Sequence, residues 1–374
     1  AERGAGPSPR MARILWVSSN GPRRAGDDSA PFIQQLARAL RARGHDIELL
    51  LPHAPGLARS ESIEDVPVTR YRYAWPESLE TLCYGAGVLA SLRARPARHA
   101  LLPGLVAAQW RATAARLARG DVALVHAHWV LPQGFTAALA AQRARVPLVV
   151  TAHGSDLFGL RGGLSTAAKR HALERADAVT VNSSATEQEA LALGAPRARL
   201  LRIPLGVADP AAVDAAAVAA RRQALRRGNG PLLLFVGRLV PDKGADDLVA
   251  ALARLRDTLP DATVALVGDG PERAALERQA AALGVAAQVQ FVGAVPPAEV
   301  PVLLQVGDIF VAPSKPVTGQ SREAQGLAML EAMLAGRPVI AAATGGIPDA
   351  VRDGETGLLV PPGSPEAIAG AIVQ

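Results

Sequence analysis

The sequence is poor in cysteine and in aromatic residues, and it has no long apolar run. Cys83 is the only cysteine among 374 residues, which excludes an internal disulfide and a metal site built on cysteine. No apolar run reaches the roughly 18–20 residues of a membrane-spanning helix, and residues 1–10 lack the apolar segment of a signal peptide. We therefore expect a cytoplasmic protein in which residues 1–10 form a disordered leader.

Charge is distributed unevenly along the chain. The net charge is +6, but residues 1–205 contain 26 Lys and Arg against 16 Asp and Glu, whereas residues 206–374 contain 14 against 18. A basic surplus fits nucleic acid, an anionic membrane surface or a phosphorylated ligand. The opposite signs of the two halves, together with the length, predict two domains with different tasks.

Short apolar segments alternate with helical patterns in both halves of the chain. Their continuous apolar character is typical of parallel strands that are covered on both faces. The expected strands are Arg13–Ser18, Asp46–Pro52, Val122–His126, Pro147–Thr151, Ala178–Asn182, Leu200–Pro204, Pro231–Val236, Ala262–Val267, Gln288–Val292, Asp308–Ala312, Pro338–Ala342 and Thr356–Val360. The expected helices include Pro31–Arg43, Gln133–Arg145, Ala245–Thr258, Pro271–Leu283 and Ala328–Gly336. This order predicts doubly wound α/β domains.

The alternation is interrupted at residues 206–230, which are rich in Ala and Arg. We predict a Rossmann-like domain at 11–205, a largely helical linker at 206–230 and a second Rossmann-like domain at 231–374. Because the chain stops inside a helical pattern, we expect the second domain to be incomplete at its end. Two such domains facing each other would form a deep cleft, and ligands of open α/β sheets bind beyond the carboxyl ends of the strands.

Two glutamates, Glu323 and Glu331, flank a loop that enters a helix near Ala328. A helix N-terminus offers free N–H groups to a phosphate. Glu331 lies about one turn inside the helix, where its carboxylate can accept hydrogen bonds from two ribose hydroxyls, and Glu323 can accept from sugar hydroxyls. The alternative is that one glutamate caps the helix and the other lies on its surface.

A second motif, from Gly237 to Gly244, follows the strand at 231–236. Arg238 and Lys243 flank a turn before the next helix, and two cations beside a helix N-terminus suit a pyrophosphate. A solvated turn is the alternative. Val292 also ends a predicted strand and is a weaker candidate for a contact to the base or ribose.

In the first half, polar residues again follow strands. His153 and Asp156 come after the strand at 147–151, and His128 comes after the strand at 122–126. His126 and His128 have no third ligand at a suitable spacing, so we expect no metal. Gly21 opens the loop after the first strand and is a candidate for acceptor contact. The loop lacks the G-x-G-x-x-G pattern of dinucleotide-binding proteins, and the chain has no P-loop and no G-x-S-x-G motif.

Residues 81–120 contain no Asp or Glu but six arginines. Interleaved apolar residues and Trp110 give this segment the character of a basic amphipathic surface for anionic lipid. A solvated pair of basic helices is an equally good interpretation. The six arginines are Arg93, Arg95, Arg98, Arg111, Arg116 and Arg119.

Taken together, the motifs resemble the group 1 (family 4) glycosyltransferases of the GT-B fold. The segments that carry the resemblance are HAHWVLPQGF, TAHGSD, FVGRLVPDKG, LVGDGPE, VQFVGAV, the pair Glu323–Glu331, AGRPVIAAATGGIPDAV and DGETGLLVPPG. The resemblance implies two Rossmann-like domains across a deep cleft. It also implies a retaining transfer of a sugar from a nucleoside-diphosphate sugar to a glycolipid or polysaccharide acceptor, without metal or other cofactor.

The resemblance also assigns roles to individual residues. Arg238 and Lys243 would bind the diphosphate and Glu331 the ribose. Glu323, with the backbone of Gly326 and Leu327, would contact sugar and phosphate, and Gly237 and Val292 would complete the donor site. His153 would lie near the transferred sugar, with Asp156 supporting its loop. The acceptor-side candidates are Gly21 and His128.

Two other functions fit the same motifs. A nucleotide-sugar epimerase or hydrolase of this fold would turn over without an acceptor. A non-catalytic protein would bind the nucleotide sugar without turnover. Nucleic-acid binding rests on the pI of about 10.2 alone, and because no nucleic-acid module is present we expect no such partner. An anionic membrane surface, contacted through the segment from Arg93 to Arg119 on the inner face of the membrane, is the further expected partner.

Overall fold

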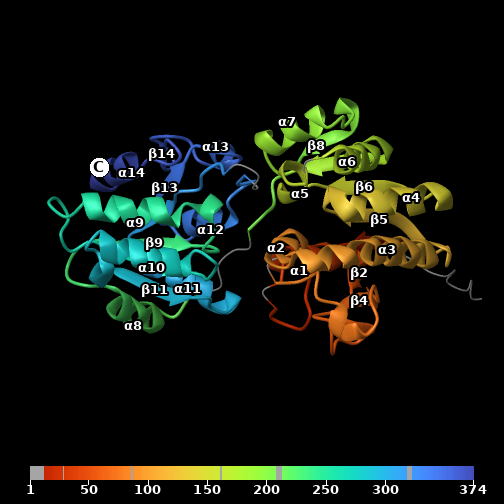
Figure 1. Cartoon of the computed structure of the whole chain (residues 1–374), viewed down its shortest axis with the longest axis horizontal. Coiled ribbons are helices and arrows are strands. Elements are labelled where there is room, and N and C mark those ends of the chain that lie inside the picture. Colours follow the sequence, from red (N-terminus) through yellow and green to blue (C-terminus); the bar gives the residue numbers. More distant parts are fainter. Residues whose placement is uncertain (1–11, 28, 86, 161, 208–212, 318–321) are drawn as a thin grey trace, which may run out of the picture. The chain divides into compact units, whose positions relative to one another are not determined.

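The computed structural model describes residues 12–27, 29–85, 87–160, 162–207, 213–317 and 322–374 (Figure 1). The predicted leader at 1–10 and part of the predicted linker, 208–212, lie outside the described residues. Contacts divide the chain into two compact units. The first runs to Val181 and continues over Glu189–Leu201, and the second contains Asn182–Gln188 and Arg202–Gln374.

The sheet of the first unit has the strand order β3-β4-β2-β1-β5-β6-β7-β8 within the described residues. Its strands are β1 Arg13–Val17, β2 Asp46–Pro52, β3 Ser60–Ile63, β4 Val66–Tyr71, β5 Val122–His128, β6 Leu148–Thr151, β7 Ala178–Val181 and β8 Leu200–Arg202. The helices are α1 Pro31–Ala42, α2 Val88–Ala94, α3 Leu102–Leu117, α4 Phe135–Ala144, α5 Ser155–Phe158, α6 Gly163–Arg175 and α7 Ser184–Ala192. The pairs from β4 through β7 are parallel, so the carboxyl ends of these strands share one edge.

Side chains alternate between the two faces of this sheet and reach a different core on each. Leu15 and Val17 pack with residues of α3, α4 and α6, whereas Trp16 packs with Ile33 of α1. Burial on both faces is the reason for the continuous apolar strands of the sequence.

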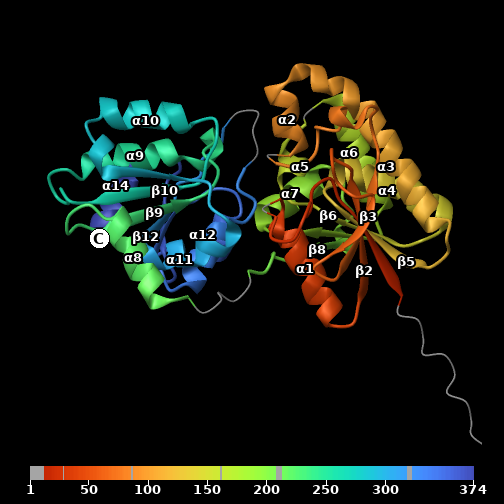
Figure 2. The same ribbon diagram turned by 90° about the horizontal axis from the view of Figure 1, so that it is seen from below.

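The second unit repeats this architecture with the strand order β11-β10-β9-β12-β13-β14 over its described residues, and the assigned pairs are parallel. Its strands are β9 Leu232–Val236, β10 Thr263–Val267, β11 Val289–Gly293, β12 Ile309–Ala312, β13 Val339–Ala342 and β14 Leu358–Val360. The helices are α8 Ala215–Leu225, α9 Ala245–Arg254, α10 Arg273–Ala282, α11 Val300–Val306, α12 Leu327–Leu334, α13 Ile347–Ala350 and α14 Pro365–Val373. Figure 2 shows α9, α10 and α14 on one face and α8, α11 and α12 on the other.

The structure confirms the predicted α/β class with two parallel sheets. The β3–β4 hairpin was not predicted, because Pro67 interrupts its second strand and three of the four residues of its first strand are polar. Residues 213–230 of the predicted linker belong to the second unit, where α8 packs against α11. No helix among the described residues is long and apolar enough to cross a membrane.

One arginine of the predicted basic surface is not on the surface. Arg116 is only 5% exposed. Its guanidinium donates to Glu48 at 2.9 Å and to Asp121 at 2.5 Å. The prediction was wrong for Arg116, because two carboxylates compensate the burial of its charge.

Candidate active site

The loops at the carboxyl edge of the second sheet are packed backbone against backbone. A Cβ atom at Gly268 would lie 1.9 Å from the carbonyl oxygen of Gly237, and one at Gly244 would lie 1.9 Å from that of Pro313. These residues follow β9, β10 and β12 or precede α9. Since only glycine permits such an approach, the glycines join the loops into one layer.

The two residues predicted to bind the diphosphate differ in whether an acidic side chain already pairs with them. Arg238 is exposed, and its side chain makes no hydrogen bond or ion pair with the described residues. Lys243, in contrast, donates from Nζ to Glu323 Oε2 at 2.5 Å. Ser314 Oγ, just beyond β12, donates to the same oxygen at 3.2 Å. Arg238 is therefore unpaired as far as the described residues go, whereas Lys243 is neutralised by a predicted site residue.

Several interactions keep Glu323 ionised. Burial alone would raise the pKa of this carboxyl group, but the charge of Lys243 and the hydrogen bonds from Lys243, Ser314 and the Gly326 backbone outweigh burial and lower it. The backbone of Glu323 is fixed as well, because its carbonyl oxygen accepts from the N–H of Gly346 at 3.0 Å. The structure thus brings Lys243, Glu323 and Gly326 together.

Helix α12 begins directly after this loop. Gly326 precedes it with a φ of 81°, and no described side chain caps the helix, so backbone N–H groups of its first turn, which starts at Leu327, remain available. Glu331, on the same helix, is half-buried, and its side chain makes no hydrogen bond to the described residues. Burial raises the pKa of the Glu331 carboxyl group. A desolvated carboxylate beside a free helix N-terminus is suited to a ligand that presents both hydroxyls and an anion.

If Glu331 binds the ribose as predicted, its raised pKa makes nucleotide binding dependent on pH. We expect nucleoside-diphosphate affinity to fall as the pH decreases through this pKa, because the protonated acid loses acceptor capacity for the ribose hydroxyls. Calorimetric titrations of wild type and Glu331→Gln across mildly acidic pH would measure the effect. Protonation of the nucleotide's own phosphate affects wild type and variant alike. The difference between the two pH profiles therefore reports protonation of Glu331 alone. Parallel profiles would contradict this role.

The backbone of Gly345 also packs closely against the backbone of Glu323. Its φ is 58°, and a Cβ would lie 1.9 Å from the Glu323 carbonyl oxygen. Gly363 has a similar φ of 72° but no atom within 4 Å of a Cβ. We expect Gly363→Ala to cost about 1–2 kcal/mol from the left-handed backbone alone, and Gly345→Ala to cost more and to reduce turnover. Thermal unfolding and initial rates would check this, and equal effects at both positions would contradict it.

Gly237 and Val292 lie at the carboxyl ends of two strands of this sheet. The Gly237 N–H donates to Val267 O at 2.9 Å, and Val292 lies half-buried in β11. Gly237 and Arg238 follow β9 and Val292 is near the end of β11, with β10 between the two strands, so all three residues lie at the same edge of the sheet. Their backbone positions are compatible with the donor contacts predicted for them.

In the first unit, three histidines stack at the carboxyl ends of β5 and β6. His128 Nδ1 lies 3.2 Å from His153 Nε2, and the two rings are stacked with centroids 5.4 Å apart. The His126 ring stacks on His128 from the other side, at 4.3 Å. Burial lowers the pKa of His153 to about 3 and that of His126 to about 4, so the stack is neutral at physiological pH. His128 is fully buried, and its side chain contacts His153 rather than solvent.

Asp156 fixes the backbone of this region. Its carboxylate accepts from Val130 N at 2.6 Å and from His153 N at 3.1 Å. Burial raises the pKa of the carboxyl group despite these hydrogen bonds. Asp156 is therefore placed to orient His153.

Gly21 is buried, and a Cβ there would lie 3.0 Å from Leu51. The loop that it opens is held by Arg70, which is 1% exposed and donates to the carbonyl oxygens of Pro22 and Arg23 at 3.3 Å. Gly21 thus allows this loop to pack closely against Leu51, and the buried guanidinium of Arg70 fixes the loop through its backbone carbonyl groups.

Sequence reasoning assigned no role to several residues that hold the donor loops. Ser314 and Gly346 contact Glu323, and the buried Gln325 side chain bonds both backbone groups of Leu205 at 2.8 Å. Ser314 could have been found, because it follows a predicted strand. Gln325 lacked any signal, because its partner is 120 residues away.

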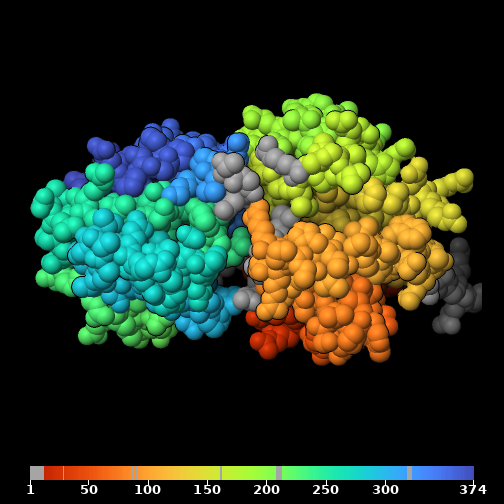
Figure 3. Space-filling model, viewed as in Figure 1, coloured from red at the N-terminus to blue at the C-terminus, as the bar shows by residue number. Residues whose placement is uncertain are grey.

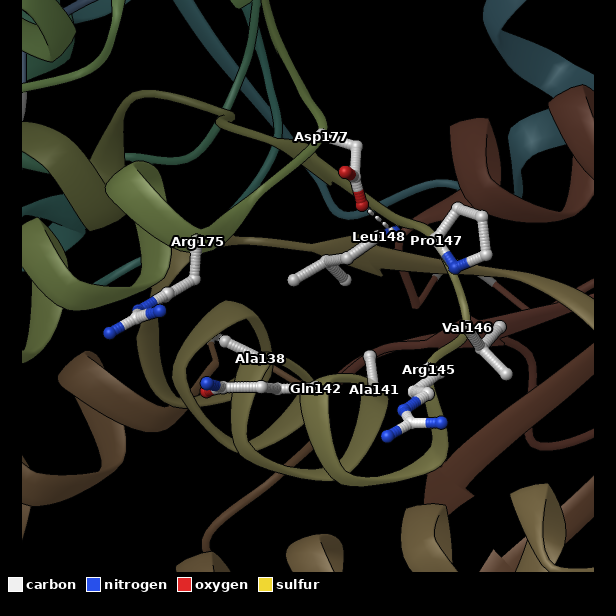
Figure 4. Close-up of a pocket in the computed structure, with 9 residues that line it drawn as sticks. All are labelled: Ala138, Ala141, Gln142, Arg145, Val146, Pro147, Leu148, Arg175 and Asp177. Carbon is white, nitrogen blue, oxygen red and sulfur yellow. Dashed lines mark hydrogen bonds between the residues drawn. The ribbon is translucent and has the colours of Figure 1, made fainter.

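A cavity of about 320 Å³ lies elsewhere in the first unit, near the amino end of β6 (Figure 4). Arg145 caps α4 and Arg175 ends α6, so both cations complement the negative ends of helices. Asp177 accepts from the Leu148 N–H at 2.8 Å, as the dashed line shows. Helix termination explains these polar groups, and no predicted site residue lines the cavity.

Both units thus have a doubly wound α/β architecture. Within the part of the chain that the structure describes, the second unit combines Arg238 without a side-chain partner, helix α12 without a side-chain cap and the carboxylate of Glu331 without a hydrogen bond. Residues 29–206 match the family described as glycosyl transferase 4-like domain, and residues 219–374 match glycosyl transferases group 1.

Relatives and solved structures extend these matches to nearly the whole chain. A GDP-mannose-dependent alpha-(1-6)-phosphatidylinositol monomannoside mannosyltransferase of Mycobacterium tuberculosis is 30% identical, over 97% of this chain and 89% of that protein. The protein of the same description from Mycolicibacterium smegmatis is 35% identical over 64% of either chain. The structure of sucrose-phosphate synthase from Thermosynechococcus elongatus superimposes with a TM-score of 0.74 at 25% identity, covering 97% of this chain and 89% of that one.

The chain belongs to the group 1 glycosyltransferases, enzymes of the GT-B fold.

Proposed function

We propose that the protein transfers a sugar, with retention of configuration and without a metal ion, from a nucleoside-diphosphate sugar to a glycolipid or polysaccharide acceptor. The observation that carries the proposal is Arg238, which has no side-chain partner among the described residues and lies on the same loop as Lys243. Lys243 pairs with Glu323, on the loop that enters α12. The named relatives use GDP-mannose, which supports a nucleotide-sugar donor here.

The donor site assigns one part of the ligand to each group. Arg238 and Lys243 bind the diphosphate, together with backbone N–H groups at Leu327, and Glu331 accepts hydrogen bonds from the ribose. Glu323 contacts the transferred sugar. These groups stabilise the leaving diphosphate as its charge develops in the transition state.

In the reaction, the bond between the anomeric carbon and the diphosphate oxygen breaks, and the acceptor oxygen bonds to that carbon on the same face. The acceptor proton passes to the departing phosphate, so the products are the glycoside and the nucleoside diphosphate. No protein nucleophile is required. His153, held neutral by burial and positioned by Asp156, acts as a hydrogen-bonding partner of the sugar.

The test is turnover with a panel of GDP-mannose, UDP-glucose and ADP-glucose, with and without phosphatidylinositol mannoside or methyl α-mannoside. We expect nucleoside-diphosphate release that depends on an acceptor, an α-linked product by NMR, and rates unchanged by EDTA. Release without an acceptor would indicate a hydrolase or epimerase. Binding without turnover would indicate a non-catalytic protein. A β-linked product or inhibition by EDTA would contradict retention or metal independence.

We also propose that the first unit contacts an anionic membrane surface on its cytoplasmic side. The segment from α2 to α3, orange in Figure 3, carries exposed Arg93, Arg95, Arg111 and Arg119. An apolar groove of about 390 Å³ lies along α3 and α4, where Trp110 and Leu139 are 39% and 38% exposed. A basic surface beside an apolar groove suits the interface of an anionic bilayer.

Co-sedimentation with vesicles of phosphatidylglycerol and phosphatidylcholine tests this contact. We expect binding at low salt that decreases at high salt, and a loss of binding when the exposed arginines of this segment are changed to glutamine. Arg116 is left unchanged, because it is buried in an ion-pair network. Equal binding of both proteins would contradict the proposal.

A further inference from the structure

Trp75 is 83% exposed and lies on the loop that leaves the carboxyl end of β4. Exposure alone does not mark a site, since single apolar side chains are common on protein surfaces. The way in which this indole is held is more informative, because the chain directly before it is fixed by buried polar contacts.

Glu80 provides this fixation. Its carboxylate is almost fully buried and accepts from the N–H groups of Tyr73 and Ala74 at 2.8 and 3.3 Å and from Arg72 Nε at 2.9 Å. His53, which follows β2, lies 2.5 Å away through Nδ1. Four contacts thus converge on one carboxylate and hold the backbone that presents Trp75 in a defined orientation.

Arg72 also occupies one face of the indole. Its guanidinium carbon lies 5.5 Å from the ring centroid of Trp75, and its Nη2 donates to Ala74 O at 3.2 Å. A fixed cation on one face leaves the opposite face of an 83%-exposed ring open to a ligand.

The loop is packed beside the loop predicted to contact the acceptor. Tyr84, farther along the Trp75 loop, donates to Pro52 O at 2.5 Å, and Arg23 lies over the Tyr84 ring at 6.0 Å. Arg23 belongs to the loop that Gly21 opens. Trp75 is therefore on the ligand-binding edge of the first sheet, in the unit without the diphosphate ligands.

The local charges favour a neutral ligand. Arg72 is engaged by Glu80 and lies 3.8 Å from the half-exposed Glu77, so residues 72–80 present a carboxylate and no unpaired cation. That arrangement disfavours an anionic bilayer. The negative face of an aromatic ring attracts the C–H groups of a sugar or cyclitol ring, while Glu77 and Arg72 can bond its hydroxyls.

We propose that Trp75 is a stacking platform for a neutral hydroxylated six-membered ring, a sugar or cyclitol of the acceptor. This inference rests on the proposed function for the identity of the acceptor. The platform binds the ring through its C–H face, and the polar contacts of Glu80 keep the indole in place.

The experiment compares wild type with Trp75→Ala, Trp75→Phe and the control Leu164→Ala, which removes another exposed apolar side chain of the first unit. The probes are myo-inositol and methyl α-mannoside, followed by the indole N–H resonance that disappears in Trp75→Phe. We expect this resonance to shift with a ring probe in the absence of donor. In turnover, Trp75→Ala should raise the KM for acceptor about tenfold, with nucleoside-diphosphate affinity unchanged and partial rescue by phenylalanine.

An unshifted Trp75 resonance, or an unchanged acceptor KM in Trp75→Ala, would overturn the inference. A third result would also overturn the inference: neither wild type nor Trp75→Ala binds a ring probe, and Trp75→Ala loses the vesicle binding of wild type. Trp75 would then be assigned to a membrane contact. Failure of the proposed function is seen separately, as a wild-type protein that binds the ring probes but does not turn over any nucleotide sugar.

Discussion

Arg238→Ala is expected to weaken nucleoside-diphosphate binding about 10- to 100-fold, and more than Lys243→Ala does. Arg238 is exposed and has no side-chain partner among the described residues, so it gains a phosphate contact without giving up another. A hydrogen bond to a charged group contributes about 1.5–3 kcal/mol. Lys243 must exchange Glu323, at 2.5 Å, for the phosphate, so its net contribution to binding is smaller.

Isothermal titration calorimetry with GDP, UDP and ADP would measure these differences. Arg352→Ala is the matched control, because Arg352 belongs to the same unit but forms an exposed pair with Glu355 at 2.9 Å. We expect no change for the control. Equal losses for Arg238→Ala and Lys243→Ala would show that the Lys243–Glu323 pair does not reduce the contribution of Lys243, and an unchanged affinity in Arg238→Ala would remove that residue from the diphosphate site.

The strands were predictable from the sequence because parallel strands covered on both faces must be apolar throughout. Observed strands such as Asp46–Pro52 coincide with their predicted ranges, and most others differ by one or two residues at an end. Candidate residues at strand ends could also be proposed, since loops after parallel strands share one edge. This reasoning placed Arg238 and His153 on loops that leave strands, and in the structure they follow β9 and β6; their roles stay predictions.

Ion pairs between distant segments were not predictable. Lys243 and Glu323 are 80 residues apart, and Arg116 and Glu48 are 68 apart, so no local pattern signals either pair. From sequence alone, a charged side chain is expected to lie in solvent. Its burial can be predicted only when its oppositely charged partner is known, and only the tertiary structure brings that partner close. The same limit applied to Glu80, whose burial gives Trp75 its fixed position.

Glu323→Gln is expected to bind nucleoside diphosphate several-fold more tightly than wild type while its turnover falls about 100-fold or more. Glutamine keeps the shape of the side chain but removes the negative charge that pairs with Lys243. The lysine is then available to the diphosphate, and a repulsive carboxylate is lost from its neighbourhood. Turnover falls because the proposed contact of the carboxylate with the transferred sugar is lost, and this contact matters most in the transition state.

A double-mutant cycle separates the two ways in which Glu323 could act on binding. If the carboxylate restrains Lys243, the gain in affinity should disappear in the Lys243→Ala background. Glu331→Gln serves as the control, because it should lower affinity through the ribose and produce no gain. Weaker binding by Glu323→Gln would contradict the expectation and mean that the ion pair orients Lys243 for the phosphate. A gain that persists without Lys243 would mean that the Glu323 carboxylate repels the diphosphate directly. The cycle therefore shows whether Glu323 lowers affinity by pairing with Lys243 or by repelling the ligand.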